Sequence, residues 1–480
     1  MAVIDPRVGN PFLPVPLTAP LGGSSRRTLV VGKRVRLMGL IMALPFIYLW
    51  AAYGKMEFRA PAPSRPAATL SVRGRILAGD GTVLASSVNR PDATIWDTAR
   101  RTYPQGALAA QLVGFTNTDG GLEGIEHFQD AKLAAGKDVV LTIDPAFQAS
   151  AEAGLAEIIK SEQADAGSVV AIEAGTGRVL AVANYPTFSP GHFQDGTPEA
   201  YGNRAFMFQY EPGSTVKALV AAALVNDGDA TPTTTLNAPM WRSVGGWRIN
   251  DSVAHPSTLD LTHVLRYSSN VGISTLAERL GQAKLHAYYQ AFGFGQPSPI
   301  SGMASAPGLL HPWQDWSEVG FANASFGQGF SVTTLQLATA FSILTNNGLY
   351  IPPRLVEGAP VETPHRVIQA ASAATTRAML KTVIEEALPT AAGIPGYCLG
   401  GKTGTAQVAV NGGYSDTIYS ALFAGFFPCD HPRVTMVVEV FNGRKSHHGS
   451  QVAAPAFRNI AEEVLAHWAV PPQPIAAEVR

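Results

Sequence analysis

The sequence predicts an α+β protein: a large domain with a central antiparallel sheet and a helical insert, preceded by a small, mostly-β N-terminal domain and one transmembrane helix. Three observations support this prediction. Apolar strand-like segments lie at both ends of the large domain, the stretch between them has helical periodicity, and a long uncharged run stands near the N-terminus. The sheet is therefore expected to combine strands from both ends of the domain around the helices.

The uncharged run, residues 37–53, is expected to be a transmembrane anchor helix. As an α-helix it reaches roughly 26 Å, enough to cross a hydrocarbon core. Residues 1–36 form a basic tail in which one acid, Asp5, stands against several arginines and lysines. Basic residues favour the cytoplasmic side, so we expect a single-pass protein of the cytoplasmic membrane with the rest of the chain periplasmic or extracytoplasmic. A cleaved signal peptide and a buried core helix are the alternatives, and signal peptides usually have a shorter apolar region.

The exported part is expected to contain two domains. Residues 54–137 begin with a Pro-rich spacer and continue with short strands and turn signals such as Gly79-Asp80-Gly81. They form a short N-terminal domain that is too small for a large core of its own. Residues 138–470 form the large domain, and residues 471–480 are a C-terminal tail.

The elements of the large domain follow from local patterns. A strand over residues 138–144 precedes a helix that begins at Pro145, since proline is favoured at the first helical position. Strands over 168–172 and 178–183 are separated by a turn signal, and strands over 402–410 and 418–427 read as a second hairpin. A strand over 434–441 and a helix over 454–468 complete the domain.

The two cysteines, Cys398 and Cys429, flank the second hairpin. They would face each other across its base, and an oxidising compartment permits a disulfide there. Two buried free thiols fit the sequence equally well.

Composition limits the classes of function. The chain has 480 residues, 46% hydrophobic and 15% charged, with a net charge of −1. This balance gives no global field for nucleic acid. The sequence has neither a glycine-rich phosphate loop nor a cluster of His, Cys and carboxylates at metal-ligand spacing, so we expect no cofactor and no metal.

The first chemical motif is Ser214-Thr215-Val216-Lys217. It follows Glu211-Pro212-Gly213 and opens a long Ala/Leu/Val run, which predicts a buried helix. Ser214 then lies in the first turn, where free backbone N–H groups favour negative charge, and Lys217 shares its face. A desolvated lysine amine has a lowered pKa and can take a proton from a hydroxyl. The bland alternative is a capped helix with a snorkelling lysine.

Two further motifs follow: Ser268-Ser269-Asn270 and Lys402-Thr403-Gly404-Thr405. Each has an ordinary alternative, a helix terminus for Asn270 and a protected edge strand for the Lys402 segment. Together and in this order, the three motifs are typical of enzymes that form an acyl-serine intermediate. We expect a cleft between the helices carrying Ser214 and Ser268 and the strand carrying Lys402.

Beyond the three motifs, the chain resembles the class B penicillin-binding proteins, the monofunctional peptidoglycan D,D-transpeptidases, whose catalytic domain has a serine β-lactamase-like fold. Further segments share the family's pattern: Arg73-Gly74-Arg75, Gly114-Phe115-Thr116-Asn117, Ser325-Phe326-Gly327-Gln328-Gly329 and Val452-Ala453-Ala454-Pro455. The second of them is most similar to the division-specific septal type. The N-terminal domain is shorter than in larger relatives.

The resemblance implies a role for each catalytic residue. Ser214 would attack the penultimate carbonyl of a stem peptide ending in D-Ala-D-Ala, and Lys217 would accept its proton. Ser268 would pass a proton to the leaving amine, while Asn270 would orient the substrate and hold Lys217.

The third motif would bind the substrate. Lys402 and the hydroxyls of Thr403 and Thr405 would hold the terminal carboxylate, and Gly404 would let the strand backbone come close. The backbone N–H groups of Ser214 and Thr405 would form the oxyanion hole.

The resemblance also implies partners and rivals. Partners would be peptidoglycan stem peptides, β-lactams as covalent inhibitors, a membrane-embedded SEDS-family glycosyltransferase and other division proteins. The rival functions are an elongation-type transpeptidase, a D,D-carboxypeptidase, a β-lactam sensor and a division scaffold. A class A β-lactamase is disfavoured because the sequence lacks a Glu-x-x-Leu-Asn segment after the second motif.

Overall fold

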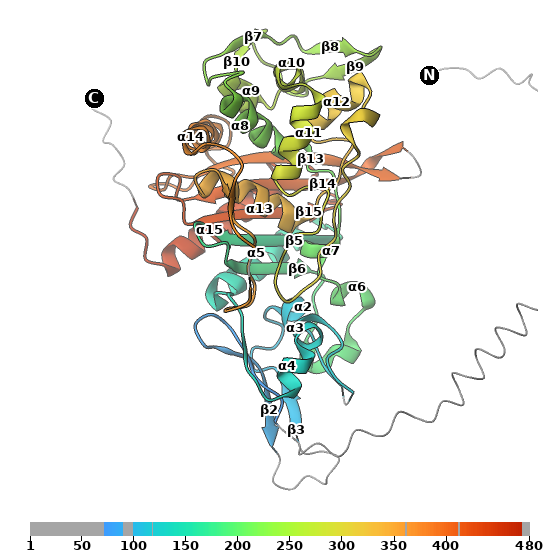
Figure 1. Cartoon of the computed structure of the whole chain (residues 1–480), viewed down its shortest axis with the longest axis vertical. Coiled ribbons are helices and arrows are strands. Elements are labelled where there is room, and N and C mark those ends of the chain that lie inside the picture. Colours follow the sequence, from blue (N-terminus) through green and yellow to red (C-terminus); the bar gives the residue numbers. More distant parts are fainter. Residues whose placement is uncertain (1–71, 90–98, 118, 361, 411–412, 473–480) are drawn as a thin grey trace, which may run out of the picture. The chain divides into compact units, whose positions relative to one another are not determined.

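A five-stranded antiparallel sheet forms the centre of the fold, in the order β13-β14-β15-β5-β6 (Figure 1). Its strands come from both ends of the large domain, as the sequence predicts. They are β5 (Ala166–Glu173), β6 (Val179–Tyr185), β13 (Gly400–Val410), β14 (Gly413–Phe427) and β15 (Val434–Phe441). The pairing of β15 with β5 joins the C-terminal hairpin to the N-terminal one.

The computed structural model describes residues 72–89, 99–117, 119–360, 362–410 and 413–472. The predicted basic tail 1–36, the anchor 37–53 and most of the C-terminal tail lie outside the described residues. No helix within the described ranges has the length and apolar character needed to cross a membrane. The described residues belong to one compact unit that begins at Ser71.

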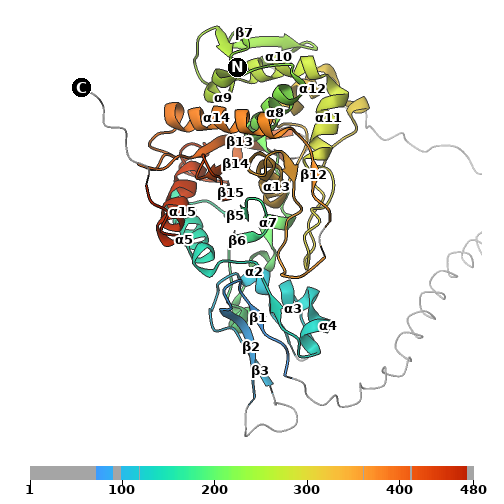
Figure 2. The same cartoon turned by 60° about the vertical axis from the view of Figure 1, so that its left-hand side comes forward.

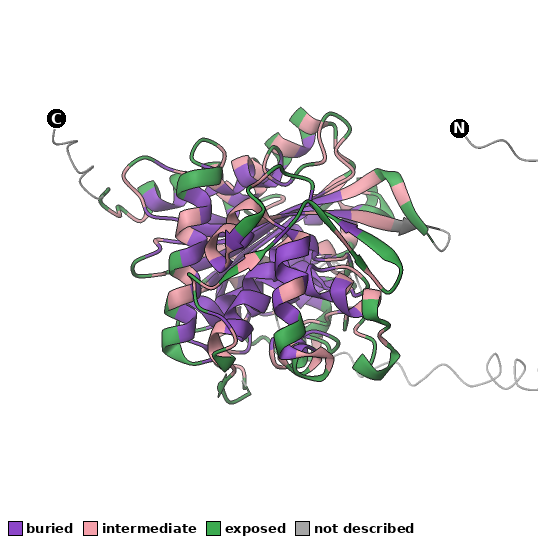
Figure 3. Ribbon diagram, turned by 90° about the horizontal axis from the view of Figure 1, so that it is seen from above, coloured by how far each residue is buried: buried purple, intermediate pink, exposed green. Residues whose placement is uncertain are grey.

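Helices cover both faces of the sheet (Figure 2). One face carries α5 (Pro145–Glu162) and α15 (Ala453–His467), which also pack on each other. The other face carries α13 (Thr334–Thr345), all of whose residues are buried. Because both faces are covered, the strands consist of nearly continuous apolar residues, and Figure 3 shows the buried residues gathered along the sheet and its helices.

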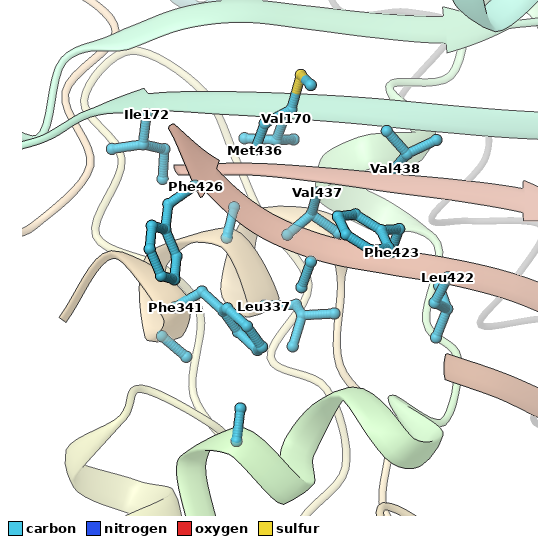
Figure 4. Packing of buried hydrophobic residues seen from close by; sticks show 14 of the residues in the cluster. Val170, Ile172, Leu337, Phe341, Leu422, Phe423, Phe426, Met436, Val437 and Val438 are labelled. Atoms are coloured by element: carbon cyan, nitrogen blue, oxygen red, sulfur yellow. The ribbon is translucent and has the colours of Figure 1, made fainter. Parts of the chain in front are cut away.

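Alternate residues of β14 contact the two helical layers. Phe423 and Phe427 reach the ring of Phe457 in α15, at centroid distances of 4.6 and 5.8 Å. Phe426 points to the opposite face, where Phe341 of α13 lies (Figure 4). A strand held from both sides in this way is a rigid support for whatever its neighbour β13 presents.

The helical insert lies between β6 and β13. Its helices are α6 (Pro198–Tyr201), α7 (Arg204–Met207), α8 (Lys217–Asp227), α9 (Leu261–Tyr267), α10 (Asn270–Leu280), α11 (Gln282–Ala291), α12 (Glu318–Ser325), α13 and α14 (Ala370–Ala387). Short 3-10 turns span Pro190–Asp195, Gly213–Val216 and Trp313–Asp315. The predicted buried helix after Ser214 is confirmed, since Lys217 through Leu224 of α8 are all buried.

The insert also contains short strands that the sequence reading missed. They are β7 (Thr235–Asn237), β8 (Trp241–Val244), β9 (Trp247–Asn250), β10 (Thr258–Asp260), β11 (Leu349–Tyr350) and β12 (His365–Arg366). They form three two-stranded sheets. Most of their residues are exposed or partly buried, so they lack the apolar alternation on which strand prediction depends.

The N-terminal part contains a four-stranded sheet in the order β3-β2-β1-β4. Its strands are β1 (Ile76–Leu77), β2 (Val83–Asn89), β3 (Ala99–Thr102) and β4 (Val139–Val140), and its helices are α2 (Ala110–Val113), α3 (Gly124–Phe128) and α4 (Asp130–Ala134). In the described residues of this part, three helices lie beside the short strands, so it is mixed rather than mostly β as expected. The buried Glu126 carboxylate bridges the guanidinium groups of Arg73 and Arg101 at 2.7 and 2.6 Å, which fixes α3 to the sheet.

Cys398 and Cys429 form a disulfide at the base of the β13–β14 hairpin, with their Cα atoms 5.1 Å apart. The Cys429 N–H also donates to the Cys398 carbonyl at 2.8 Å. Of the two arrangements that the sequence left open, the structure has the bridge. It closes the hairpin directly before β13 begins.

We predict that Cys398→Ser/Cys429→Ser lowers the free energy of unfolding by about 3 kcal/mol, because a bridge between residues 31 positions apart restricts the unfolded chain. The measurement is chemical denaturation of the oxidised wild-type protein and the double variant. Reducing agent should destabilise only the wild-type protein, and equal stability of the oxidised wild-type and double-variant proteins would contradict the prediction.

Candidate active site

Ser214 lies in the 3-10 turn Gly213–Val216, which continues directly into α8. A close backbone contact holds this turn, with the Gly213 N–H donating to the Gly327 carbonyl at 3.0 Å. Gly327 has a φ of +90°, and a Cβ there would lie 2.1 Å from the Gly213 carbonyl oxygen. Only glycine allows this approach, which explains what the Ser325–Gly329 segment does: it supports the turn that presents Ser214.

Lys217 is the first residue of α8, one helical turn after Ser214, and its side chain is fully buried. Its Nζ donates to the Ser268 carbonyl at 2.5 Å and to Asn270 Oδ1 at 2.6 Å, and lies 3.3 Å from Ser268 Oγ. Burial lowers the pKa of Lys217 well below its usual value, and the positive charge of Lys402 lowers it further, while Asp251 acts in the opposite direction. A neutral amine in this place can accept a proton from a hydroxyl.

Ser268 stands between the two lysines. It ends α9 with a left-handed backbone, φ +57°, just before α10 begins at Asn270. This conformation aims its carbonyl and its hydroxyl at Lys217, while Lys402 Nζ reaches the same hydroxyl at 3.0 Å. The hydroxyl therefore connects the two amines.

Lys402 lies on β13 at the edge of the central sheet, and its side chain is also buried. Burial lowers its pKa to about 7. Its Nζ is 3.2 Å from the Thr403 carbonyl. The Thr405 Oγ1 accepts a hydrogen bond from the Gly449 N–H at 3.1 Å, which leaves its own proton free to be donated.

Gly404 allows β13 to pack against the Ser214 turn. A Cβ at this position would lie 2.9 Å from Thr215 Cγ2 and 3.0 Å from the Pro212 carbonyl oxygen. The strand and the turn are therefore in direct contact. The structure thus brings together the three motifs that the sequence analysis singled out: Ser214, Lys217, Ser268, Asn270, Lys402, Thr403, Gly404 and Thr405.

The motif analysis missed Asp251 and His255. Asp251 follows β9 and accepts hydrogen bonds from the Asn270 N–H at 2.5 Å and the Ser269 hydroxyl at 2.5 Å. His255 Nε2 lies 2.7 Å from the same carboxylate. No sequence signal marks the two residues, because they lie in a loop far from any motif.

A second contact that the motif analysis missed holds the far end of the β13–β14 hairpin. Tyr414 donates its hydroxyl proton to Glu211 Oε1 at 2.9 Å, and the Gly329 N–H reaches the same oxygen at 2.8 Å. Glu211 lies just before the Ser214 turn, and burial raises its pKa.

Among the described residues, the one group of three potential metal ligands is Cys398, Cys429 and Asp430. The two sulfurs of this group are already joined in the disulfide.

Comparison with known proteins gives a consistent result. The model of the penicillin binding protein transpeptidase domain matches residues 167–462, and that of the penicillin binding protein A dimerisation domain matches residues 73–151. The chain is 32% identical to the probable peptidoglycan D,D-transpeptidase PenA of Neisseria meningitidis over 75% of its own length and 67% of the relative's. It is 33% identical to the peptidoglycan D,D-transpeptidase FtsI of Escherichia coli K12, over 78% and 68% of the two chains.

Solved structures show the same fold. The apo crystal structure of penicillin binding protein 3 from Mycobacterium tuberculosis superposes with a TM-score of 0.78 at 32% identity, covering 84% of this chain and 98% of that one. The same protein has been solved in complex with aztreonam, with a TM-score of 0.79. The motifs, their geometry and these matches agree: the chain belongs to the penicillin-binding protein transpeptidase family.

Proposed function

We propose that this protein is a peptidoglycan D,D-transpeptidase that cross-links stem peptides ending in D-Ala-D-Ala through an acyl-Ser214 intermediate during septal wall synthesis. The observation that supports it most directly is the buried amine of Lys217, one turn from Ser214. Three oxygens of Ser268 and Asn270 surround that amine. Such a site needs no cofactor, because the base and the nucleophile are both side chains.

Acylation begins when Ser214 Oγ attacks the penultimate carbonyl and Lys217 takes the hydroxyl proton. The oxyanion that forms is stabilised by the backbone N–H groups of Ser214 and Thr405. When the intermediate collapses, the C–N bond breaks and the terminal D-Ala leaves as an amine. Its proton comes from Lys217 through Ser268, whose hydroxyl contacts both lysines.

The terminal carboxylate of the substrate binds at β13. Lys402 supplies the charge, and Thr403 and Thr405 supply hydroxyls on the partly exposed side of the strand. Since the Thr405 oxygen already accepts from the Gly449 N–H, its own hydrogen can be donated to the carboxylate. A bound carboxylate also favours the charged form of Lys402.

Deacylation decides which product forms. In a transpeptidase the amine of a second stem peptide attacks the Ser214 ester, forms the new amide and releases the serine. In a D,D-carboxypeptidase, water attacks instead. The matched relatives carry the name D,D-transpeptidase, which supports the first outcome.

The septal role and the membrane location complete the proposal. The Gly114-Phe115-Thr116-Asn117 segment and the similarity to FtsI support division over elongation. Residues 37–53 would anchor the chain in the cytoplasmic membrane, with a SEDS-family glycosyltransferase and other division proteins as partners. The localisation of a tagged protein tests this, since accumulation along the side wall would favour an elongation-type enzyme.

We predict that Ser214→Ala abolishes covalent labelling by a fluorescent penicillin, because no other group replaces the ester-forming oxygen. Labelling is measured on denaturing gels with the folded variant, and its melting temperature should match that of the wild type. The nearby Ser269→Ala is unsuitable as a comparison variant, because Ser269 caps α10 and its loss would disturb the helix. Labelling that survives in Ser214→Ala would show that the nucleophile is another residue.

We predict that the second-order rate of penicillin acylation has a bell-shaped pH profile. Lys217 must be neutral, so the rate falls at acidic pH; Lys402 must be charged, so it falls as pH rises through about 7. The alkaline limb should disappear in Lys402→Arg, because arginine stays charged at every accessible pH. A wild-type rate that keeps rising above pH 9 would exclude this role for Lys402.

The decisive measurement of function uses lipid-linked disaccharide-pentapeptide together with a wall polymerase. We predict cross-linked dimers in the mass spectrum of the products, and none with Ser214→Ala. Trimmed monomers in place of dimers would identify a carboxypeptidase. Covalent penicillin binding without any product from the peptide would favour a sensor or a division scaffold.

A further inference from the structure

Asp251 and His255 form a buried pair behind the Ser268–Asn270 segment. Their side chains are 1% and 0% exposed, and His255 Nε2 lies 2.7 Å from Asp251 Oδ2. The pair sits in the loop between β9 and β10, outside every motif of the proposed reaction. Two buried ionisable groups at this position require an explanation, because burial of charge is costly unless the charge is paired.

The Asp251 carboxylate organises the start of α10. Oδ1 accepts from the backbone N–H groups of Asn270 and Val271 at 2.5 and 3.0 Å. Oδ2 accepts from the Ser269 hydroxyl at 2.5 Å, and that hydroxyl in turn accepts from the Gly272 N–H at 2.8 Å. The carboxylate thus accepts three hydrogen bonds at the start of α10, where the positive end of the helix dipole favours an acidic side chain.

These hydrogen bonds of Asp251 also affect the surroundings of Lys217, the proposed base. Asn270 and Ser268 flank Ser269, and both contact the Lys217 amine. A carboxylate that fixes Ser269 and the Asn270 backbone therefore fixes the two groups that surround this amine. Asp251 also carries a negative charge near Lys217, which on its own favours the protonated form of that amine.

Both ring nitrogens of His255 face oxygen atoms. Its Nδ1 lies 2.8 Å from the Pro256 carbonyl oxygen, which can only accept, so Nδ1 bears a hydrogen. Its Nε2 faces Asp251 Oδ2, which also accepts from the Ser269 hydroxyl. Each ring nitrogen thus has an oxygen partner, and an imidazolium is the form of the ring that would donate to both.

Other ionisable groups pack on Tyr267, a neighbour of the pair: the Arg266 guanidinium lies 4.2 Å from its ring and pairs with Glu386 at 2.8 Å. The Tyr267 ring lies 5.7 Å from the His255 ring, and His263 stacks on the other part of Tyr267 while pairing with Asp260 at 2.7 Å. Lys217 and Lys402 lie on the far side of the Ser268–Asn270 segment. His255 is thus the basic side chain that directly contacts the Asp251 carboxylate.

We propose that Asp251 and His255 are positioning residues of the reaction: Asp251 holds Ser268 and Asn270 around Lys217, and the imidazolium of His255 cancels the charge of Asp251 so that Lys217 stays neutral. This inference rests on the proposed function in one respect, the use of Lys217 as the base. The two residues have different roles: Asp251 supplies the hydrogen bonds, and His255 neutralises the charge of Asp251.

The test is the pH profile of fluorescent-penicillin acylation by the full-length protein. His255→Gln keeps a side-chain donor but removes the charge, so Asp251 is left uncompensated and the pKa of Lys217 rises. We expect the acid limb to move to higher pH by about half a unit or more, as a unit charge at this range produces. The double variant Asp251→Asn/His255→Gln removes both charges, and its acid limb should return towards the wild-type position with a lower maximal rate.

Two controls distinguish a specific effect of His255 from a general loss of charge or of folding. His263→Gln removes a half-exposed histidine on the same side of the site, and we expect no shift of the acid limb. Melting temperatures show whether each variant is folded. An unshifted acid limb in folded His255→Gln, or an undiminished maximal rate in folded Asp251→Asn/His255→Gln, would overturn the proposal.

A second measurement needs no folded variant. Nitrogen-15 spectra of histidine-labelled wild-type protein distinguish an imidazolium from a neutral ring, and we expect His255 to stay doubly protonated above pH 7. A neutral His255 ring at pH 7 would refute the inference. Labelling of Ser214 in the wild type is unaffected by either outcome, so a failure here is distinct from a failure of the proposed function.

Discussion

The burial of one amine is the constraint on which the rest of the site depends. Lys217 occupies the start of a helix that is otherwise Ala, Leu and Val, and only the oxygens of Ser268 and Asn270 contact its nitrogen among the described residues. Removal from water lowers the pKa of Lys217 and so favours its neutral form. The second motif must then stay in contact with Lys217, because an unsatisfied buried amine costs free energy. Catalytic readiness and local stability therefore depend on the same contacts.

The site holds this geometry through contacts between backbones. Gly327 touches the carbonyl of Gly213, and Gly404 touches Thr215 and Pro212. Through these glycines the Ser214 turn is enclosed between an α12-linked loop and the edge of a sheet that helices cover on both faces. The nucleophile is thus held between closely packed backbone segments, which lowers the cost of reaching the reactive geometry.

The sequence predicted the motifs, the sheet built from both ends and the buried helix, because each depends on a local pattern: residue spacing, apolar runs or turn residues. It did not predict Asp251 and His255, whose importance comes from contacts with residues that follow more than ten positions later. The sequence also did not predict the exposed β8–β9 hairpin or the three described helices of the N-terminal part. These elements are too short to show a periodic pattern of apolar residues. The choice between a disulfide and two free thiols could be made only once the register of β13 on β14 was known.

The order of strands in the central sheet has a consequence for biosynthesis. A chain leaves the ribosome from its N-terminus, so β5 and β6 are made long before β15, the strand that must pair with β5. Until then one edge of β5 is open, and Ser214 has neither Lys402 nor Gly404 beside it. The nucleophile thus exists in a nascent chain that cannot yet use it. Synthesis of β13 and β15, rather than synthesis of the Ser214 helix, therefore sets the moment at which the enzyme can first react.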